Sequence, residues 1–527
     1  RVATVALVVV VATAIAASGS ACGTYNLSTR HEPHTVVTAM GLLTRLTGSS
    51  EPADESRGRP LPGPGGVPVL GASVQLGKFP KIWDGFSEYS EKYGSLVGVQ
   101  IGSRYCLLVN SAECIREILV NKANQFANRP DFLRFHAIFR WNRHLSVALC
   151  DWSAKQRTRR DLLYGPLHPR NGACQQTKLF KAISSQTSAL MTELKSKAGV
   201  ALEPRRLILY AVGNVFYDFF CSTTFDWSDK TYQHIVELYN EVFHELFKGF
   251  AIDVMPWLKP FYQKRLNELN SMAGEISQFT SRMIEEHEHS LDGHEEDPRD
   301  ITDILLLYLR NHAAANKSNE GTLDQIDVDV IVEDLIGGFP VVSNLFLWAI
   351  WIIAGEPAVQ DKLYEEYMSV NGSGVCDSEH KKSLVYAEGA MYELMRVVCS
   401  PIIPHVAVED TTLKGYHVPK DTMVMFNTCD LNFNPDHWEE PKKFRPERFI
   451  RDGMVQKPDF FFPFGTGKRA CMGDGIVRHV VHLMLSTLFG HFRVRLAPGT
   501  APLNYIEARG KVIMDSEPHF VFEPRQS

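Results

Sequence analysis

The pattern of apolar and polar positions divides the chain into an apolar start, a proline-rich segment and a long, mainly helical remainder. Residues 2–17 are apolar apart from two threonines, and residues 2–29 carry no charge. Extended to Cys22, the run reaches about 20 residues, the length that a helix needs to cross a bilayer. It is either a retained signal-anchor helix or a cleaved signal peptide; a mitochondrial transit peptide would carry more arginines.

The next segments predict the domain organisation. We expect a membrane anchor at residues 1–25 and a polar linker at residues 26–59. Residues 60–68 (PLPGPGGVP) form a proline-rich hinge, which cannot be helix or central strand because proline fixes φ and lacks an N–H. One folded domain then occupies residues 69–527.

Within this domain the periodicity predicts mostly helix with a minor β part. Residues 86–93 read as a helix, residues 95–101 and 106–109 as a strand pair, and residues 178–368 as long helical stretches. Strand and turn signals return at residues 411–426, and residues 389–398 and 476–488 read as helices. The fold class is therefore mainly α with a minor β part.

Composition excludes several classes of protein. Hydrophobic residues make up 44% of the chain and charged residues 22%, as in ordinary globular proteins. The net charge is −6, so we expect no nucleic-acid partner. The ten cysteines are too sparse for a disulfide scaffold and include no C-x-x-C pair, which disfavours a zinc ribbon or a thioredoxin-type site.

One cysteine lies in a segment with a chemical pattern. From Phe464 to Gly473 the chain fits F-x-x-G-x-R-x-C-x-G, with Gly467, Arg469 and Cys471 at the inner fixed positions. Each position is useful if Cys471 is a thiolate ligand of haem iron. Gly467 and Gly473 would let the backbone approach a flat macrocycle, Arg469 would bind a propionate, and Phe464 would shield the sulfur. The predicted helix that follows favours a thiolate at its N-terminus.

A charge network is predicted upstream of this cysteine. Glu393 and Arg396 form an E-x-x-R pair whose spacing places both side chains on one helix face. Arg448, in the FRPERF segment at residues 444–449, would complete the network. If buried, these charges must be fully paired, and their role would be to hold the loop that carries Cys471.

With these motifs in order, the sequence resembles the cytochrome P-450 superfamily from the hinge onward. The resemblance implies the cytochrome P-450 fold, with residues 69–527 as a haem-thiolate catalytic domain that binds one haem b. It also implies a monooxygenase that acts on a lipophilic substrate with dioxygen, and electrons from NADPH through NADPH-cytochrome P-450 reductase. The family's topology would anchor the chain in the endoplasmic reticulum membrane with the catalytic domain facing the cytosol.

The resemblance also implies contacts to the haem propionates and to the reductase. Trp152 looks like a propionate contact, but Gln156 stands where the family has arginine, so Arg157 or Arg160 would take that role. His405 looks like the residue that reaches the other propionate. A basic cluster would face the reductase, and its members are Lys155, Arg157, Arg159, Arg160, Lys468 and Arg469.

The helix expected over the haem departs from the family pattern. Pro340 and Val341 replace the acid and the threonine that usually relay protons. A proline inside a long helix should kink it and free the carbonyl of Ile336. Proton delivery would then use water, Ser343 or the substrate's own hydroxyl, unless the reaction needs none. The candidate catalytic positions on this helix are Gly337, Gly338, Phe339 and Ser343.

These departures are similar to those of the arthropod spook/spookier group, which works in ecdysteroid synthesis. Other shared stretches are residues 129–132, 150–153, 256–258, 260–263 and 400–407. The resemblance implies a sterol substrate, at an early step between 7-dehydrocholesterol and the ketodiol. Two alternatives stay open: a haem-thiolate isomerase or dehydratase that needs no external electrons, and a non-catalytic haem or sterol binder.

Overall fold

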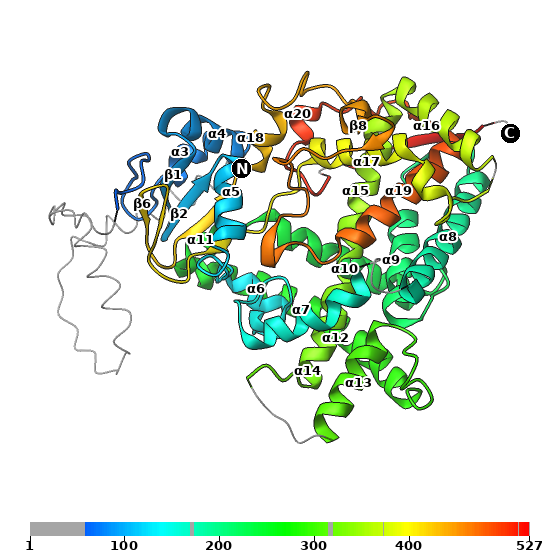
Figure 1. Cartoon of the computed structure of the whole chain (residues 1–527), viewed down its shortest axis with the longest axis horizontal. Helices are drawn as coiled ribbons and strands as arrows, with labels where there is room; N and C mark the ends of the chain where they lie inside the picture. The colour runs from blue at the N-terminus through cyan, green and yellow to red at the C-terminus, as the bar shows by residue number, and fades with distance from the viewer. Residues whose placement is uncertain (1–57, 169–172, 315–319, 373, 515, 526–527) are drawn as a thin grey trace. The chain divides into compact units, whose positions relative to one another are not determined.

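The computed structural model describes residues 58–168, 173–314, 320–372, 374–514 and 516–525. The expected anchor at residues 1–25 and all but the last two residues of the linker at 26–59 lie outside the described residues. The described part is mainly helical, with β1, β2 and β6 on one side of the body and β8 near α16 and α17 (Figure 1). This confirms the fold class of mainly α with a minor β part.

Long helices make up most of the body. The helices of ten or more residues are α4 (Ile82–Tyr93), α7 (Ala154–Leu167), α8 (Ala173–Ser196), α9 (Arg205–Cys221), α10 (Lys230–Lys248), α12 (Lys259–His289), α13 (Ile301–Ala314), α14 (Gln325–Ile336), α15 (Phe339–Ala354), α16 (Pro357–Val370), α17 (Val385–Val398) and α19 (Asp474–His491). Shorter helical turns are α3 (Ser73–Leu76), α5 (Ala112–Arg116), η2 (Glu117–Asn121), α6 (Leu133–Ile138), η3 (Arg143–Leu145), α11 (Ala251–Val254), η4 (Pro256–Leu258), η5 (His380–Ser383), α18 (Thr428–Phe433), η6 (Pro446–Phe449), η7 (Gly467–Arg469) and α20 (Tyr505–Ala508).

The strands form small sheets. The largest has the order β1-β2-β7-β4, from β1 (Leu96–Ile101), β2 (Arg104–Val109), β7 (Met423–Phe426) and β4 (His405–Val406). In it β1 and β2 are an antiparallel hairpin that pairs Leu96 with Val109, and β2 runs parallel to β7. The others contain β10 (Phe492–Leu496), β11 (Phe520–Pro524) and β3 (Ala201–Leu202), or the pairs β5 (Thr411–Leu413) with β6 (Tyr416–Val418) and β8 (Ile450–Arg451) with β9 (Met454–Val455).

The core is built around α15. This helix packs against α9, α17 and α19, and of its residues only Val341 and Trp351 are not fully buried. By length and composition the stretch Gln325–Ala354 could cross a membrane, but 78% of its most apolar window is buried inside the body. It is therefore the core helix of a folded domain.

The expected kink at Pro340 takes a different form. The helical stretch is interrupted before the proline, so that α14 ends at Ile336 and α15 begins at Phe339. Gly338 N donates to the carbonyl of Leu335 at 3.2 Å, a tight turn of the i to i−3 type. Pro340 falls in the first turn of α15, where its missing N–H costs no helical bond.

The proline-rich segment contains no helix or strand at residues 60–66, and it packs on the folded body. Arg59 pairs with the β5–β6 hairpin, donating to the carbonyl of Gly415 and accepting from His417 N. Gly98 in β1 donates to the carbonyl of Pro62 at 2.8 Å. An ideal Cβ on Gly63 would lie 1.9 Å from the carbonyl oxygen of Gly98, so the segment is held tightly against the edge of the sheet.

We expect Gly63→Ala to lower the free energy of unfolding by about 1–3 kcal/mol, because the new methyl group forces the segment away from β1. Gly65→Ala is the matched control, since an ideal Cβ there meets nothing within 4 Å. Denaturant unfolding measures both variants. Equal stability of the two would contradict the packing of this segment on β1.

Candidate active site

Cys471 lies in the short loop between η7 and the N-terminus of α19. Its backbone N donates to the carbonyl of Phe464 at 2.9 Å, which closes the loop. The Cys471 side chain is exposed, yet it lies deep in the body, where burial raises the pKa of its thiol. The N–H of Gly473 and the charge of Arg160 act on this pKa in the opposite direction. The side chain is thus accessible although protein surrounds it.

Two glycines of the motif serve the loop differently. Gly467 has φ of 73°, and an ideal Cβ there would lie 1.8 Å from the carbonyl oxygen of Leu119. Its lack of a side chain is therefore required by its contact with η2, and the expected approach to a macrocycle stays a prediction. At Gly473 the nearest atom to an ideal Cβ is Cys471 Sγ, at 4.0 Å, so a side chain there would stand beside the sulfur.

Arg469 and Arg129 form a buried pair of cations. Arg469 is 8% exposed and Arg129 is 6% exposed, and both donate to the carbonyl of Ala148, at 3.1 Å each. Among the described residues neither has a carboxylate within ion-pair distance. Burial and the charge of Arg469 together hold the pKa of Arg129 well below its usual value. Buried cations without a counter-charge are costly, so this place suits an anionic group.

The other expected propionate contacts lie around these arginines. Trp152 is half-buried, with the Arg469 guanidinium 5.9 Å from its ring centre. His405 is buried, and its Nδ1 lies 2.6 Å from the carbonyl oxygen of Phe126. Burial and the charge of Arg129 hold the pKa of His405 well below its usual value.

The two candidates for the displaced arginine differ in position. Arg157 is exposed. Arg160 is half-buried and donates to the carbonyl of Ala470 at 2.8 Å, directly before Cys471. Gln156, where the family has arginine, is buried and donates to the carbonyl of Val147 at 2.7 Å.

Glu393, Arg396 and Arg448 are brought together. Arg396 Nε and one terminal nitrogen donate to the two oxygens of Glu393 at 2.8 Å each, and Arg448 Nε donates to Oε1 at 3.0 Å. Arg396 also donates to the carbonyls of Asn432 and Pro441. Two cations and one buried carboxylate thereby fasten α17 to the chain that leads toward Cys471.

The glycines at the break between α14 and α15 are accessible, whereas the other candidate catalytic side chains point into packing. Gly337 and Gly338 are partly exposed, as is Val341 near the start of α15. The Phe339 ring contacts Phe216 and Tyr239, at centroid distances of 6.4 and 5.5 Å.

Ser343 is also turned into the protein. It is buried, and its hydroxyl donates to the carbonyl of Phe339 at 2.9 Å. The catalytic roles of Phe339 and Ser343 remain predictions.

The donor set fits haem b. The Cys471 side chain is accessible, and a thiolate is the ligand that haem iron takes in haem-thiolate proteins. Arg129 and Arg469 offer the positive charge that two propionates would neutralise, with Trp152 and His405 beside them. Sequence reasoning missed Arg129 as a site residue, although it begins one of the stretches shared with the spook group.

Comparison with known proteins places this geometry in a family. The family model for Cytochrome P450 matches residues 61–522. This chain belongs to the cytochrome P450 family. Cytochrome P450 307a1 of Drosophila melanogaster is 31% identical over 82% of this chain and 83% of its own length, which confirms the resemblance to the spook group. Cytochrome P450 1A1 of Sparus aurata and of Limanda limanda are 28% and 29% identical, over 83% and 84% of this chain and 86% of their own.

Family membership settles the general chemistry. Proteins of this family bind haem b through a cysteine thiolate, and this chain is an oxidoreductase of the monooxygenase type. The family implies a lipophilic substrate, dioxygen and a redox partner. Its members are typically associated with the endoplasmic reticulum membrane.

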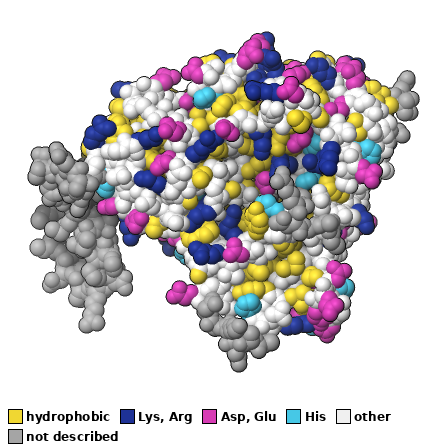
Figure 2. All heavy atoms as spheres, viewed as in Figure 1, with side chains coloured by type: hydrophobic (Ala, Val, Ile, Leu, Met, Phe, Trp, Pro, Cys, Tyr) yellow, Lys and Arg dark blue, Asp and Glu magenta, His cyan; other side chains and the backbone are white. Residues whose placement is uncertain are grey.

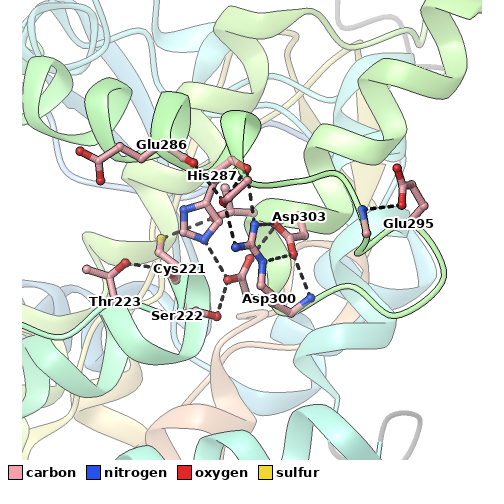
Figure 3. A network of polar contacts seen from close by, with 12 residues as sticks. Cys221, Ser222, Thr223, Glu286, His287, Glu295, Asp300 and Asp303 are labelled. Atoms are coloured by element: carbon pink, nitrogen blue, oxygen red, sulfur yellow. Dashed lines mark hydrogen bonds and ion pairs between the residues drawn. The ribbon is translucent and has the colours of Figure 1, made fainter.

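A second cluster of possible metal ligands, His287, Asp300 and Asp303, carries no such chemistry. Their ligand atoms lie within 4.8 Å of one another (Figure 3). However, two nitrogens of Arg299 donate hydrogen bonds to the Asp303 carboxylate, at 2.7 Å each. Asp300 Oδ2 accepts a hydrogen bond from the Ser222 hydroxyl at 2.6 Å and lies 3.0 Å from His287 Nε2. Because both carboxylates are already paired, the cluster closes the turn between α12 and α13.

Gly467→Ala should abolish haem incorporation, because the methyl group would collide with the carbonyl of Leu119 and displace the loop. Gly465→Ala is the matched control: φ is 68° there too, but an ideal Cβ meets nothing within 4 Å. It should cost about 1–2 kcal/mol of stability and retain haem. The haem content and the carbon monoxide difference spectrum of each variant test this, and haem retention by Gly467→Ala would refute the account.

Proposed function

We propose that this protein is a sterol monooxygenase that acts at an early step of ecdysteroid synthesis, between 7-dehydrocholesterol and the ketodiol. It would use dioxygen and electrons from NADPH through NADPH-cytochrome P450 reductase. It would reside in the endoplasmic reticulum membrane, held by residues 1–25, with its catalytic domain in the cytosol. The observation that carries the proposal is the similarity to cytochrome P450 307a1 across most of both chains.

The residues divide the work of the reaction. Bound haem b supplies the dioxygen activation by which an oxygen atom enters a C–H bond. Cys471 holds the iron, Arg129 and Arg469 hold the propionates, and the network of Glu393, Arg396 and Arg448 keeps the loop in place. Val341, an apolar side chain that is partly exposed at the start of α15, would favour a lipophilic substrate.

A second function is favoured by the replacement of the usual acid and threonine by Pro340 and Val341. A haem-thiolate isomerase or dehydratase acting on an oxygenated lipid needs no proton relay to dioxygen and no external electrons. The two functions differ in their requirement for NADPH and the reductase.

Reconstituted with the reductase, the purified protein should oxidise 7-dehydrocholesterol-type sterols only when NADPH and dioxygen are present. Mass spectrometry with isotopically labelled dioxygen would follow the oxygen into the product. Cys471→Ala should lose both the thiolate-type carbon monoxide spectrum and the product. Product formation without NADPH would favour the isomerase or dehydratase, and unchanged sterols would reject the substrate assignment.

The expected basic surface for the reductase is smaller than the sequence suggested. Arg469 is buried, and so is Arg159, which pairs with Asp327 at 2.6 Å. Arg157 is exposed, and the half-buried Lys468 holds its Nζ 4.0 Å from the ring centre of Trp152. On the face drawn in Figure 2, basic and acidic side chains are interspersed. Any electrostatic steering by this surface therefore depends on few side chains.

Arg157→Glu should slow the first electron transfer from the reductase several-fold at low ionic strength and leave the haem content unchanged, because the charge meets the partner and not the haem. Arg157→Lys should keep the rate. Stopped-flow reduction under carbon monoxide measures it. Loss of haem from Arg157→Glu would instead make Arg157 a propionate ligand, and an unchanged rate would remove it from the docking surface.

A further inference from the structure

An acid stands on α14, one helical turn before the glycine break. The backbone carbonyl of Glu333 accepts from Gly337 N at 2.8 Å. At about 1.5 Å of rise per residue, Glu333 lies about 6 Å along the helix axis from Gly337. The chain has no acid at position 340. Glu333 is therefore a candidate source of protons on this helix.

A groove opens beside this acid. The groove measures about 580 Å³ and is lined by Arg140, Ser277, Gln278, Ser281, Arg282, Glu285 and Asp329. Two of these residues bind the Glu333 carboxylate: Arg140 donates to Oε1 at 2.6 Å, and Ser277 makes a side-chain hydrogen bond. The Glu333 side chain is 12% exposed. It therefore stands between the groove and the interior.

The backbone that presents Arg140 is strained. Arg140 and Trp141 have φ of 51° and 60°, two consecutive left-handed residues, neither of them glycine. Such residues cost about 1–2 kcal/mol each, and they persist where the surroundings over-determine them, often at functional sites. Here the strain brings the guanidinium to Glu333 and, through Nε at 3.1 Å, to Ser277 Oγ.

The neighbouring acid is built for a different task. Asp334 Oδ2 accepts from Ser146 Oγ at 3.0 Å and from the backbone N of Val147 and Ala148 at 2.7 and 3.3 Å. These three donors fasten the loop after η3 to α14. With three donors on Oδ2, Asp334 serves as a structural acceptor.

We propose that Glu333 and Arg140 form the proton entry of this monooxygenase. A proton from water in the groove binds the Glu333 carboxylate, and the carboxyl then releases a proton to water on the inner side beside Gly337. Glu333 returns to the carboxylate, so nothing accumulates. Each turnover takes in two protons with the two electrons from NADPH, and the second oxygen atom of dioxygen leaves as water. The proposal rests on the monooxygenase class and not on the sterol.

The surroundings tune Glu333 for this exchange. Burial raises its pKa to about 7, with the charge of Arg140 and the bond from Ser277 opposing and the charge of Asp329 adding to the rise. From α10, the Tyr239 hydroxyl donates to the Glu333 backbone carbonyl at 3.4 Å. A carboxyl that is half protonated near neutral pH can both take up and release protons.

The first test needs no substrate. Infrared difference spectra of the haem-loaded protein, recorded across pH 5–9, should show a protonated carboxyl band that disappears with a midpoint near pH 7. Glu333→Gln should remove this band, and Asp329→Asn, in the same groove, should keep it. Arg140→Gln should move the midpoint to higher pH, because the opposing charge is gone.

The second test measures NADPH oxidation supported by the reductase, with and without sterol. For the wild type the rate should fall as pH rises through about 7, since the donor form of Glu333 is lost. Glu333→Gln should oxidise NADPH about ten-fold more slowly or worse, with no pH dependence in this range, at an unchanged carbon monoxide spectrum. Asp329→Asn should keep a pH-dependent rate, with the fall moved to lower pH, because the charge that adds to the rise of the Glu333 pKa is gone.

Wild-type rates and pH profile in Glu333→Gln, or a carboxyl band that survives in it, would overturn the proposal. Failure of sterol oxidation alone would reject the sterol substrate and leave the proton entry standing, because neither readout requires a sterol.

Discussion

The constraint on which the structure depends is the position of one sulfur atom inside the body. The loop of Cys471 is short and cannot hold itself, so it is fixed from several sides. Gly467 abuts the carbonyl of Leu119, Arg160 binds the carbonyl of Ala470, and Phe464 closes the loop on Cys471 N. The contacts with Leu119 and Arg160 come from segments far away in sequence, so the loop is correct only when the whole domain has folded.

A surplus of buried positive charge complements this sulfur. Arg129 and Arg469 share the carbonyl of Ala148 and have no described carboxylate partner, whereas the buried Arg396 is fully paired with Glu393. The contrast separates two uses of arginine. Arg396 is paired within the protein. The unpaired charges of Arg129 and Arg469 destabilise the folded protein without an anion, and an anion that binds them removes this cost. Haem binding and folding of this region are thereby linked.

The sequence was sufficient to predict the features that depend on local periodicity, which are single helices, strands and the helix face on which a residue lies. The helix expected at residues 476–488 is part of α19, the strand pair is β1 with β2, and the spacing of Glu393 and Arg396 does place both on one face. Contacts between distant segments could not be derived. Gly467 is required because of its contact with η2. The role of Arg129 depends on Ala148, 19 residues away, and on Arg469, which is farther still. Nothing in local periodicity encodes such neighbours.

Pro340 illustrates the limit most clearly. Proline in a helix interior breaks a hydrogen bond and kinks the helix, and that rule predicted a bend at this site. The chain instead ends α14 at Ile336 and starts α15 at Phe339, so that Pro340 occupies a first-turn position where an N–H would be unpaired anyway. The helix can therefore accept proline at this position without losing a helical hydrogen bond. The same interruption leaves the turn that contains Glu333 intact, since Gly337 N still bonds to its carbonyl, so an acid stands on α14 one turn before the break.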